Sequence, residues 1–199
     1  MENNWSPQQT AIFDFFGGNQ GLMSSGNLVV RARAGTGKTT TIIKACDFAS
    51  HEQSILLAAF NKRIQVELQG RITAPNVEAK TLHSLGFAFI RKQWQEVKVD
   101  AQVDRARALA ACGADSPDEM ITLVTKLAAL LKNCLPFAAD HEAVAGIAED
   151  FDLVPDEEWE EDGWDLSRVC QMALITRDAA KDRDDQGRVS FDDMIFIPL

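Results

Sequence analysis

The residues with the clearest chemistry form a glycine-rich loop near the N-terminus. The run from Arg31 to Thr40 reads Arg-Ala-Arg-Ala-Gly-Thr-Gly-Lys-Thr-Thr, and it fits the pattern G-x-x-x-x-G-K-[ST] except that Ala32 replaces the first glycine. Gly35 and Gly37 allow a tight turn whose backbone N–H groups point at phosphate oxygens. A helix that begins at the loop adds its N-terminal dipole. The loop therefore predicts a binding site for a nucleoside triphosphate.

Two side chains of the loop carry the chemistry expected at that triphosphate. Lys38 is placed to reach the β- and γ-phosphates, and the Thr39 hydroxyl is placed to ligate Mg²⁺. These two are the candidate catalytic residues, with ATP and Mg²⁺ as the cofactors. The loop residues expected to contact the nucleotide are Ala34, Gly35, Thr36, Gly37, Lys38, Thr39 and Thr40. The alternative is a chance Gly-Lys-Thr in a strand–helix turn, which the predicted strand before the loop and helix after it disfavour.

The elements around the loop alternate between helix and strand over the first 95 residues. Ser6-Pro-Gln-Gln9 opens a helix with a capping box, and apolar runs predict buried strands over 27–32 and 54–60. Further helices are predicted over 38–49, 62–71 and 81–92, with a short strand over 76–80. This alternation predicts an α/β fold in which a parallel sheet carries helices on both faces.

The sequence changes character near residue 100. From there to about residue 183, apolar spacing predicts helices over 103–112, 118–134 and 166–181, and no strand. Residues 149–165 hold ten acids and no base, and the acids from Asp156 to Asp165 are expected to be solvated. The expected domains are an ATP-binding domain over 1–99, an acidic all-helical insertion over 100–185, and a return to the first domain over 186–199.

Composition and charge leave the macromolecular partner open. The net charge is −10, but residues 1–100 carry 11 Lys and Arg against 8 Asp and Glu, so the acid lies in the second half. The overall acidity therefore neither excludes nor supports a polyanionic partner. Scattered cysteines, the lack of a signal peptide and apolar runs too short for a bilayer predict a cytoplasmic protein with no membrane partner.

Together with the loop, four further segments resemble the UvrD/Rep-like group of superfamily 1 DNA helicases. In chain order they are Ser6-Pro-Gln-Gln9, Ala58-Ala-Phe-Asn-Lys62, Thr81-Leu-His-Ser-Leu-Gly86 and Val189-Ser-Phe-Asp-Asp-Met194. The resemblance covers residues 6 to 194 and implies the N-terminal part of such a helicase, a first RecA-like P-loop NTPase domain with a helical insertion. It also implies that ATP drives movement along single-stranded DNA. RNA stays possible, because stacking and phosphate contacts do not read the 2′-hydroxyl.

The resemblance implies a role for Gln9 at the nucleotide and one for Phe60 at the nucleic acid. Gln9 would hydrogen-bond the adenine edge, although the residues alone explain it equally as part of a capping box. Phe60 would stack on a base, and its alternative is to end a buried strand.

Four more residues are implied to contact the sugar–phosphate backbone of DNA: Asn61, Lys62, Thr81 and His83. The alternatives are a solvated surface lysine at position 62, a helix cap at position 81 and a buried histidine at position 83. Asp192 and Asp193 are interpreted as structural or capping groups rather than catalytic acids.

The acidic segment that this family uses for hydrolysis is not found in the sequence. In the family, an Asp-Glu-x-x-Asp segment follows a strand and holds Mg²⁺, whereas the acids beginning at Asp156 follow no predicted strand. We therefore interpret the chain as truncated before that segment, and as dependent on the rest of a helicase chain that includes a second RecA-like domain.

Three expectations follow for the chain alone: weak nucleotide binding, negligible hydrolysis, and an unpaired sheet edge that favours self-association. Two other functions stay open. One is a P-loop phosphotransferase, and the other is a non-hydrolysing P-loop module that engages a protein partner.

Overall fold

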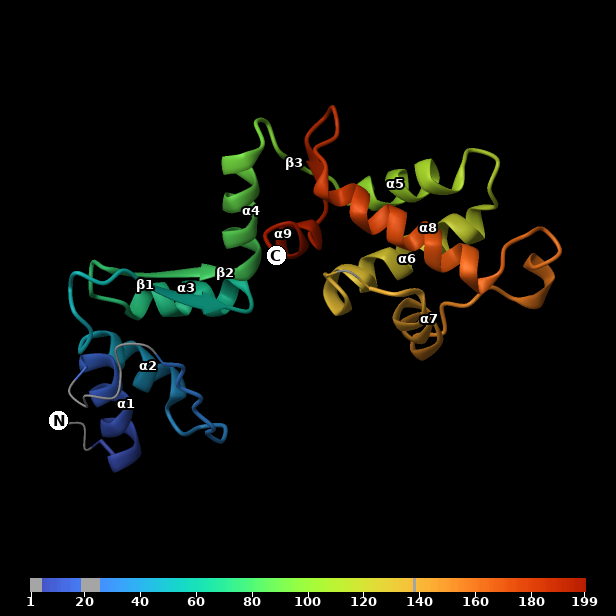
Figure 1. The fold of residues 1–199 in the computed structure, drawn as a ribbon. Helices are drawn as coiled ribbons and strands as arrows, with labels where there is room; N and C mark the ends of the chain where they lie inside the picture. The colour runs from blue at the N-terminus through green and yellow to red at the C-terminus, as the bar shows by residue number, and fades with distance from the viewer. Residues whose placement is uncertain (1–4, 19–25, 138) are drawn as a thin grey trace. The chain divides into compact units, whose positions relative to one another are not determined.

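The computed structural model describes residues 5–18, 26–137 and 139–199, and the chain divides into two compact units, Met1–Leu82 and His83–Leu199 (Figure 1). Residues 1–4, on which the expected lack of a signal peptide partly depends, lie outside the described ranges. No helix within those ranges combines the length and the apolar character that crossing a bilayer requires.

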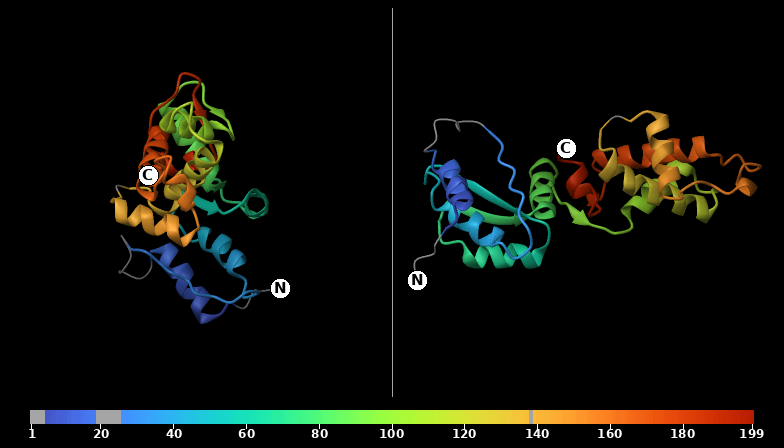
Figure 2. Two further views of the ribbon diagram at one scale, coloured as in Figure 1. Left: turned by 90° about the vertical axis from the view of Figure 1, so that its right-hand side faces the viewer. Right: turned by 90° about the horizontal axis from the view of Figure 1, so that it is seen from below.

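Within its described residues, the first unit combines three helices with two parallel strands. Its elements are α1 (Pro7–Gly17), α2 (Lys38–Cys46), β1 (Ile55–Ala59), α3 (Lys62–Arg71) and β2 (Val77–Thr81). The strands pair from Ile55 opposite Val77 to Ala59 opposite Thr81, and α3 connects them and lies along them (Figure 2). A small core joins Ala59, Leu68 and Ala79. The predicted α/β class with parallel pairing is confirmed, although this sheet is small.

The helix start predicted at Ser6 is confirmed. The Ser6 hydroxyl accepts from the Gln9 N–H at 3.3 Å, and Gln9 Oε1 accepts from the Ser6 N–H at 3.0 Å. Pro7 occupies the first helical position, where its missing N–H costs nothing. Gly18 ends the helix with a φ of 67°, a left-handed conformation that favours glycine.

The buried strand predicted over residues 27–32 is wrong. These residues have no regular secondary structure, and Val29 is 81% exposed. A strand needs a hydrogen-bonded neighbour, and among the described residues of this unit the ladder joins β1 to β2 only. The apolar run signals a preference for burial, but it does not supply the neighbouring strand that burial requires.

The second unit is a helical bundle with a two-residue strand pair. Its elements are α4 (Leu82–Gln93, whose first residue belongs to the first unit), β3 (Lys98–Val99), α5 (Val103–Cys112), α6 (Asp118–Cys134), α7 (His141–Asp150), η1 (Glu157–Trp159), α8 (Leu166–Asp178), η2 (Ala179–Lys181), β4 (Arg188–Val189) and α9 (Asp193–Phe196). The predicted bounds of α5 and α6 are confirmed. The sequence did not predict α7 or the β3–β4 pair.

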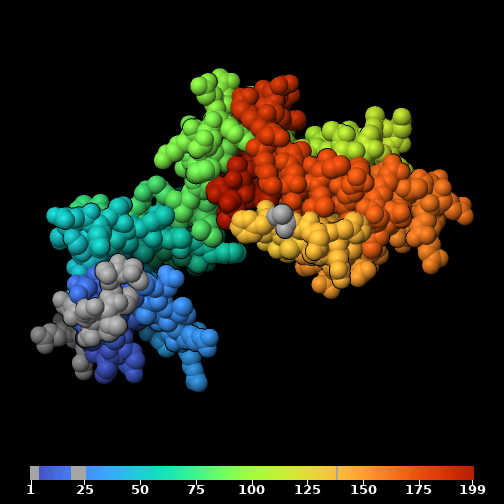
Figure 3. Space-filling view, in the orientation of Figure 1, coloured from blue at the N-terminus to red at the C-terminus, as the bar shows by residue number. Residues whose placement is uncertain are grey.

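Helices α5 to α8 form the main core of the second unit. Val124, Leu127 and Leu131 of α6 pack with Val144 of α7 and Val169 of α8, all fully buried. In the space-filling view the yellow and orange helices of this unit form one continuous body (Figure 3). The acids from Asp156 to Asp165 are exposed, as expected for a solvated face.

The end of the chain packs on α4 within the second unit. β4 pairs in parallel with β3, and Ile90, Val189 and Met194 form a second small core. Gly86 of α4 meets the backbone of α9 directly: a Cβ at this position would overlap the Met194 carbonyl oxygen and lie 2.6 Å from its carbonyl carbon. Only glycine allows this approach without a shift of one helix.

Candidate nucleotide-binding site

The loop before α2 has the backbone conformation of a phosphate cradle. Gly35 and Gly37 have φ values of 78° and 77°, which side-chain-bearing residues rarely adopt. Gly37 is the N-cap of α2 and offers no side-chain cap. The first N–H groups of this helix therefore have no capping side chain, and an anion at the helix N-terminus would satisfy them.

Lys38 lies across the loop with its ammonium held by two carbonyl groups. Nζ donates to the Ala32 oxygen at 3.0 Å and to the Arg33 oxygen at 2.8 Å. The Thr36 hydroxyl also donates to Arg33, at 2.8 Å. An ammonium has three donors, so one is left for a phosphate oxygen. Because Ala32 contributes its carbonyl and needs no positive φ, alanine can replace the first glycine of the pattern.

Gln9 stands beside the loop in a cavity of about 440 Å³. Its Nε2 donates to the Thr41 hydroxyl of α2 at 2.8 Å, while its Oε1 takes part in the capping box. The apolar part of the lining comes from Ile12, Val30 and Ile42. Gln9 is thus both a capping residue and a lining residue, so the two interpretations of Gln9 are compatible.

The remaining predicted nucleotide contacts lie in the loop and at the start of α2. Ala34 and Thr39 are exposed, and the Thr40 hydroxyl accepts from Arg71 Nη2 at 2.7 Å. The donor set fits a magnesium-bound triphosphate: backbone N–H groups and one ammonium for the phosphates, and a hydroxyl for the ion. No carboxylate is among the described residues that line the cavity.

The three residues that follow β1 are exposed. Phe60 is 85% exposed, so the alternative that it ends a buried strand is wrong. Asn61 caps α3, with its side-chain oxygen accepting from the Ile64 N–H at 2.9 Å. Lys62 donates to Gln65 at 2.8 Å on the same helix. Phe60 therefore presents an open aromatic face.

Thr81 and His83 lie on either side of the boundary between the units. Thr81 is the last residue of β2 and is half-buried. His83 is exposed in the first turn of α4, and its ring meets the Phe191 ring edge-on, with centroids 6.1 Å apart. The alternative of a buried histidine is therefore wrong.

Sequence reasoning missed a buried network of four charges in the second unit. Lys132 Nζ lies 2.5 Å from Asp104 and 2.6 Å from Asp193, and Arg107 lies 2.8 Å and 2.6 Å from the same two carboxylates. Ser190 N–H also donates to Asp193, at 2.9 Å, so Asp193 has a structural role. A lysine among the apolar residues of α6 was the signal available in the sequence.

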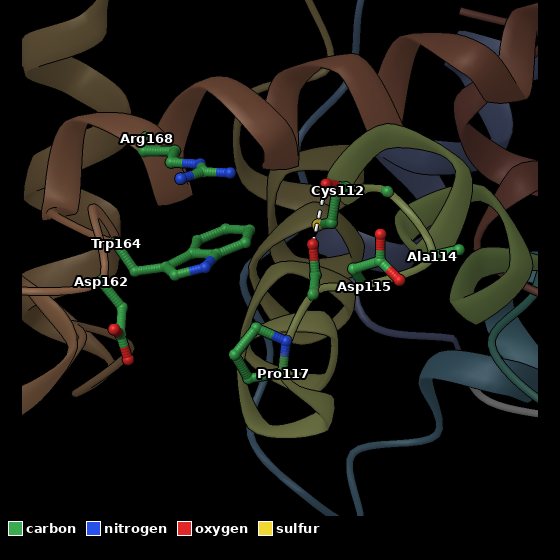
Figure 4. A pocket seen from close by; sticks show the side chains of 9 residues that line it. Cys112, Ala114, Asp115, Pro117, Asp162, Trp164 and Arg168 are labelled. Carbon is green, nitrogen blue, oxygen red and sulfur yellow. Dashed lines mark hydrogen bonds between the residues drawn. The ribbon is translucent and has the colours of Figure 1, made fainter.

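A second cavity, of about 500 Å³, lies in the helical unit (Figure 4). The Arg168 guanidinium lies over Trp164, 4.1 Å from the ring centre, and also donates to the Gly163 carbonyl at 2.9 Å. Cys112 lines the same cavity, and burial raises the pKa of its thiol, which disfavours the reactive thiolate. This cavity has no phosphate-binding loop among its described lining residues, so the loop before α2 stays the candidate nucleotide site.

Comparison with known proteins supports the assignment of a nucleotide-binding loop. The chain belongs to the AAA domain family, whose family model matches residues 19–190. A curated relative, F-box DNA helicase 1 of Gallus gallus, is 42% identical over 69 residues. That match covers 34% of this chain and 6% of the relative, so the chain matches only a small part of that relative's length.

Proposed function

We propose that this chain is the ATP-binding portion of an ATP-dependent DNA helicase or translocase that acts on single-stranded DNA. The observation that carries the proposal is the phosphate cradle at Gly35 and Gly37, with Lys38 inside it and Gln9 beside it. In this proposal residues 1–99 and 186–199 belong to a RecA-like domain of the UvrD/Rep-like type, and residues 100–185 are its helical insertion.

Each loop residue has a specific part in the proposed ATP site. The backbone from Ala34 to Thr40 and the Lys38 ammonium bind the phosphates, and Thr39 holds Mg²⁺. Gln9 reads the base, with Ile12, Val30 and Ile42 as the apolar walls. The metal, when bound, neutralises charge on the phosphate oxygens.

The DNA part of the proposal rests on the exposed aromatic ring and on the relative. Phe60 offers a stacking surface, with Asn61, Lys62, Thr81 and His83 as the contacts to sugar and phosphate. The relative that matches part of this chain is named a DNA helicase. The rest of a helicase chain, including a second RecA-like domain, is the proposed partner.

We further propose that the chain alone binds ATP but hydrolyses it negligibly. Hydrolysis needs a carboxylate near Mg²⁺ and a group that orients water. The described residues that line the cavity include no Asp or Glu. The same observation favours the second candidate function, a non-hydrolysing P-loop module that binds a protein partner.

ATP binding is tested by removal of the cradle's ammonium. Titration of the pure chain with ATP and Mg²⁺, followed by calorimetry, should show weak binding that Lys38→Ala abolishes. Lys44→Ala is the matched control, because Lys44 is a partly exposed lysine of the same helix and pairs with Asp47 outside the loop. Rapid ATP turnover by the wild-type chain would contradict the hydrolysis-deficient proposal.

DNA binding is tested by removal of the exposed ring. Phe60→Ala should weaken binding to a single-stranded oligonucleotide by about 1–3 kcal/mol, measured by fluorescence anisotropy over a series of salt concentrations. Phe137→Ala is the control, since Phe137 is also an exposed phenylalanine, at 66%. ATP binding without any DNA binding would favour the protein-binding module instead.

A further inference from the structure

Four residues of the first unit form one continuous chain of hydrogen bonds. The Ser6 N–H donates to Gln9 Oε1 at 3.0 Å, Gln9 Nε2 donates to Thr41 Oγ1 at 2.8 Å, and the Thr41 hydroxyl donates to the Gly37 carbonyl at 3.0 Å. The chain of bonds runs from the start of α1 to the phosphate loop. It passes through the one amide side chain that is proposed to read the base.

The direction of each bond is fixed by the two ends of this chain. A backbone N–H can only donate and a carbonyl can only accept. Gln9 must therefore turn its oxygen toward Ser6. Thr41 has one hydroxyl hydrogen, which goes to Gly37, so Thr41 must accept from the amide nitrogen of Gln9. The Gln9 amide cannot flip without the loss of a bond on both sides.

The fixed amide leaves a defined pattern for a ligand in the cavity. One N–H of Nε2 and one further lone pair of Oε1 stay available, in a set order. Adenine presents an acceptor, N7, next to a donor, the N6 amino group, whereas guanine presents two acceptors, N7 and O6. Gln9 can pair with both adenine atoms, but with guanine its oxygen would face another acceptor.

We propose that Thr41 is a positioning residue that holds Gln9 in the orientation that selects adenine over guanine. The proposal rests on the proposed function, because it takes this cavity as the site of the base of a bound triphosphate. Thr41 acts through Gln9, and it links base recognition to Gly37 of the phosphate loop.

The Thr41 hydroxyl can be removed with little cost to the helix. The Thr41 N–H also donates to the Gly37 carbonyl, at 2.8 Å, so this carbonyl stays paired in a Thr41→Val variant. Thr41 is buried, and valine has nearly the same shape. Thr41→Ser keeps the hydroxyl and should retain the wild-type behaviour. Thr10→Val is the matched control, since the Thr10 hydroxyl bonds to the Ser6 carbonyl, at 3.2 Å, and Thr10 is not among the described residues that line the cavity.

The test compares three probes on these four proteins: ATP, GTP and inorganic tripolyphosphate. Thr41→Val should lower the affinity for ATP about threefold to tenfold, the loss expected for one hydrogen bond, and should narrow the preference for ATP over GTP. Its affinity for tripolyphosphate should be unchanged. An equal loss for tripolyphosphate, or an unchanged ratio of ATP to GTP affinity, would overturn the proposal.

A second measurement separates this proposal from the proposed function. In nucleotide-free protein, the Gln9 side-chain amide should give a protected NMR signal that shifts in Thr41→Val and persists in Thr41→Ser. A wild-type chain that keeps this signal but binds no ATP would overturn the proposed function, and with it the role in base selection. Intact ATP binding with an unprotected Gln9 amide would overturn only the role of Thr41.

Discussion

Lys132 is a fully buried lysine whose two partners are carboxylates on different elements. Asp104 belongs to α5 and Asp193 begins α9, and Arg107 pairs with both. Two positive and two negative charges make the group neutral, which offsets much of the cost of removing each ion from water. The network therefore ties α5, α6 and α9 together at one buried point.

Asp104→Asn should give a pH-dependent loss of stability. Burial alone would raise the pKa of Asp104, but Lys132, a hydrogen bond from Ser190, and Arg107 outweigh it and hold the pKa below its ordinary value. The ionised carboxylate thus stabilises the fold above about pH 3.9, the unfolded pKa, and this contribution is lost as the pH falls toward the folded pKa. We expect the free energy of unfolding of Asp104→Asn to be about 3–5 kcal/mol lower than that of the wild type at pH 7. This difference should become smaller below pH ~4.

Urea unfolding of the wild type and the variant between pH 7 and pH 3 measures this difference. Asp115→Asn is the control, because Asp115 is exposed, and its change should stay within about 0.5 kcal/mol. A difference between wild type and Asp104→Asn that stays constant over the whole range would contradict the prediction.

Some site residues could be predicted because their conformation depends on near neighbours in the chain, whereas others depend on residues far away in the sequence. The loop glycines, Lys38 and the capping box of Ser6 with Gln9 depend on near neighbours in the chain, so their pattern predicted their conformation. The bond from Gln9 to Thr41 spans 32 positions, and that from Lys132 to Asp193 spans 61. Such pairings depend on how elements pack, which residue spacing alone does not specify.

The close packing of α4 against α9 explains why the Thr81–Gly86 segment ends in a glycine. In an isolated helix, alanine is favoured over glycine by about 1 kcal/mol. Gly86→Ala should nevertheless destabilise the second unit, because the new methyl group would meet the Met194 backbone, which has no flexible side chain to move aside. We expect a loss of about 1–3 kcal/mol in the free energy of unfolding, as for other overpacked contacts.

Gly146→Ala is the matched control in thermal or urea unfolding. Gly146 lies inside α7, and a Cβ there would meet no atom within 4 Å. The free energy of unfolding of this variant should rise by about 0.5–1 kcal/mol, because alanine has a higher helix propensity than glycine. Equal gains in both variants would show that α9 does not press on α4.

Helices and strands could be predicted where a single periodic pattern of apolar residues runs through the whole element. α6 carries 17 residues with a continuous apolar stripe and a proline before its start, and its predicted bounds match the structure. The apolar run at 27–32 was misassigned because strand formation depends on a neighbour elsewhere in the chain. β3 and β4 have two residues each, which is too short for any alternation to be detected.

The two units differ in how completely they bury their apolar residues. The helical unit has a core drawn from four helices, whereas the first unit leaves Leu56 of β1 48% exposed. Within the described residues, β1 pairs on one side only. An open edge next to exposed apolar side chains favours association with other chains.

We therefore predict that the chain self-associates at high concentration and that Leu56→Lys reduces this association. Sedimentation velocity over a range of concentrations measures the effect. Val66→Lys is the control, because Val66 is also exposed but lies on α3. A wild-type chain that stays monomeric at every concentration, or equal effects of both variants, would contradict the role of the strand edge.

The buried network of Asp104, Arg107, Lys132 and Asp193 also limits how this sequence can diverge. Loss of one charge leaves a partner ion unpaired in a buried site, so we expect single substitutions there to be selected against. Charges should instead disappear in pairs, one acid with one base. A descendant with a neutral residue in place of Lys132 should also carry a neutral residue at Asp104 or Asp193, and such paired changes would record this contact in the sequences of relatives.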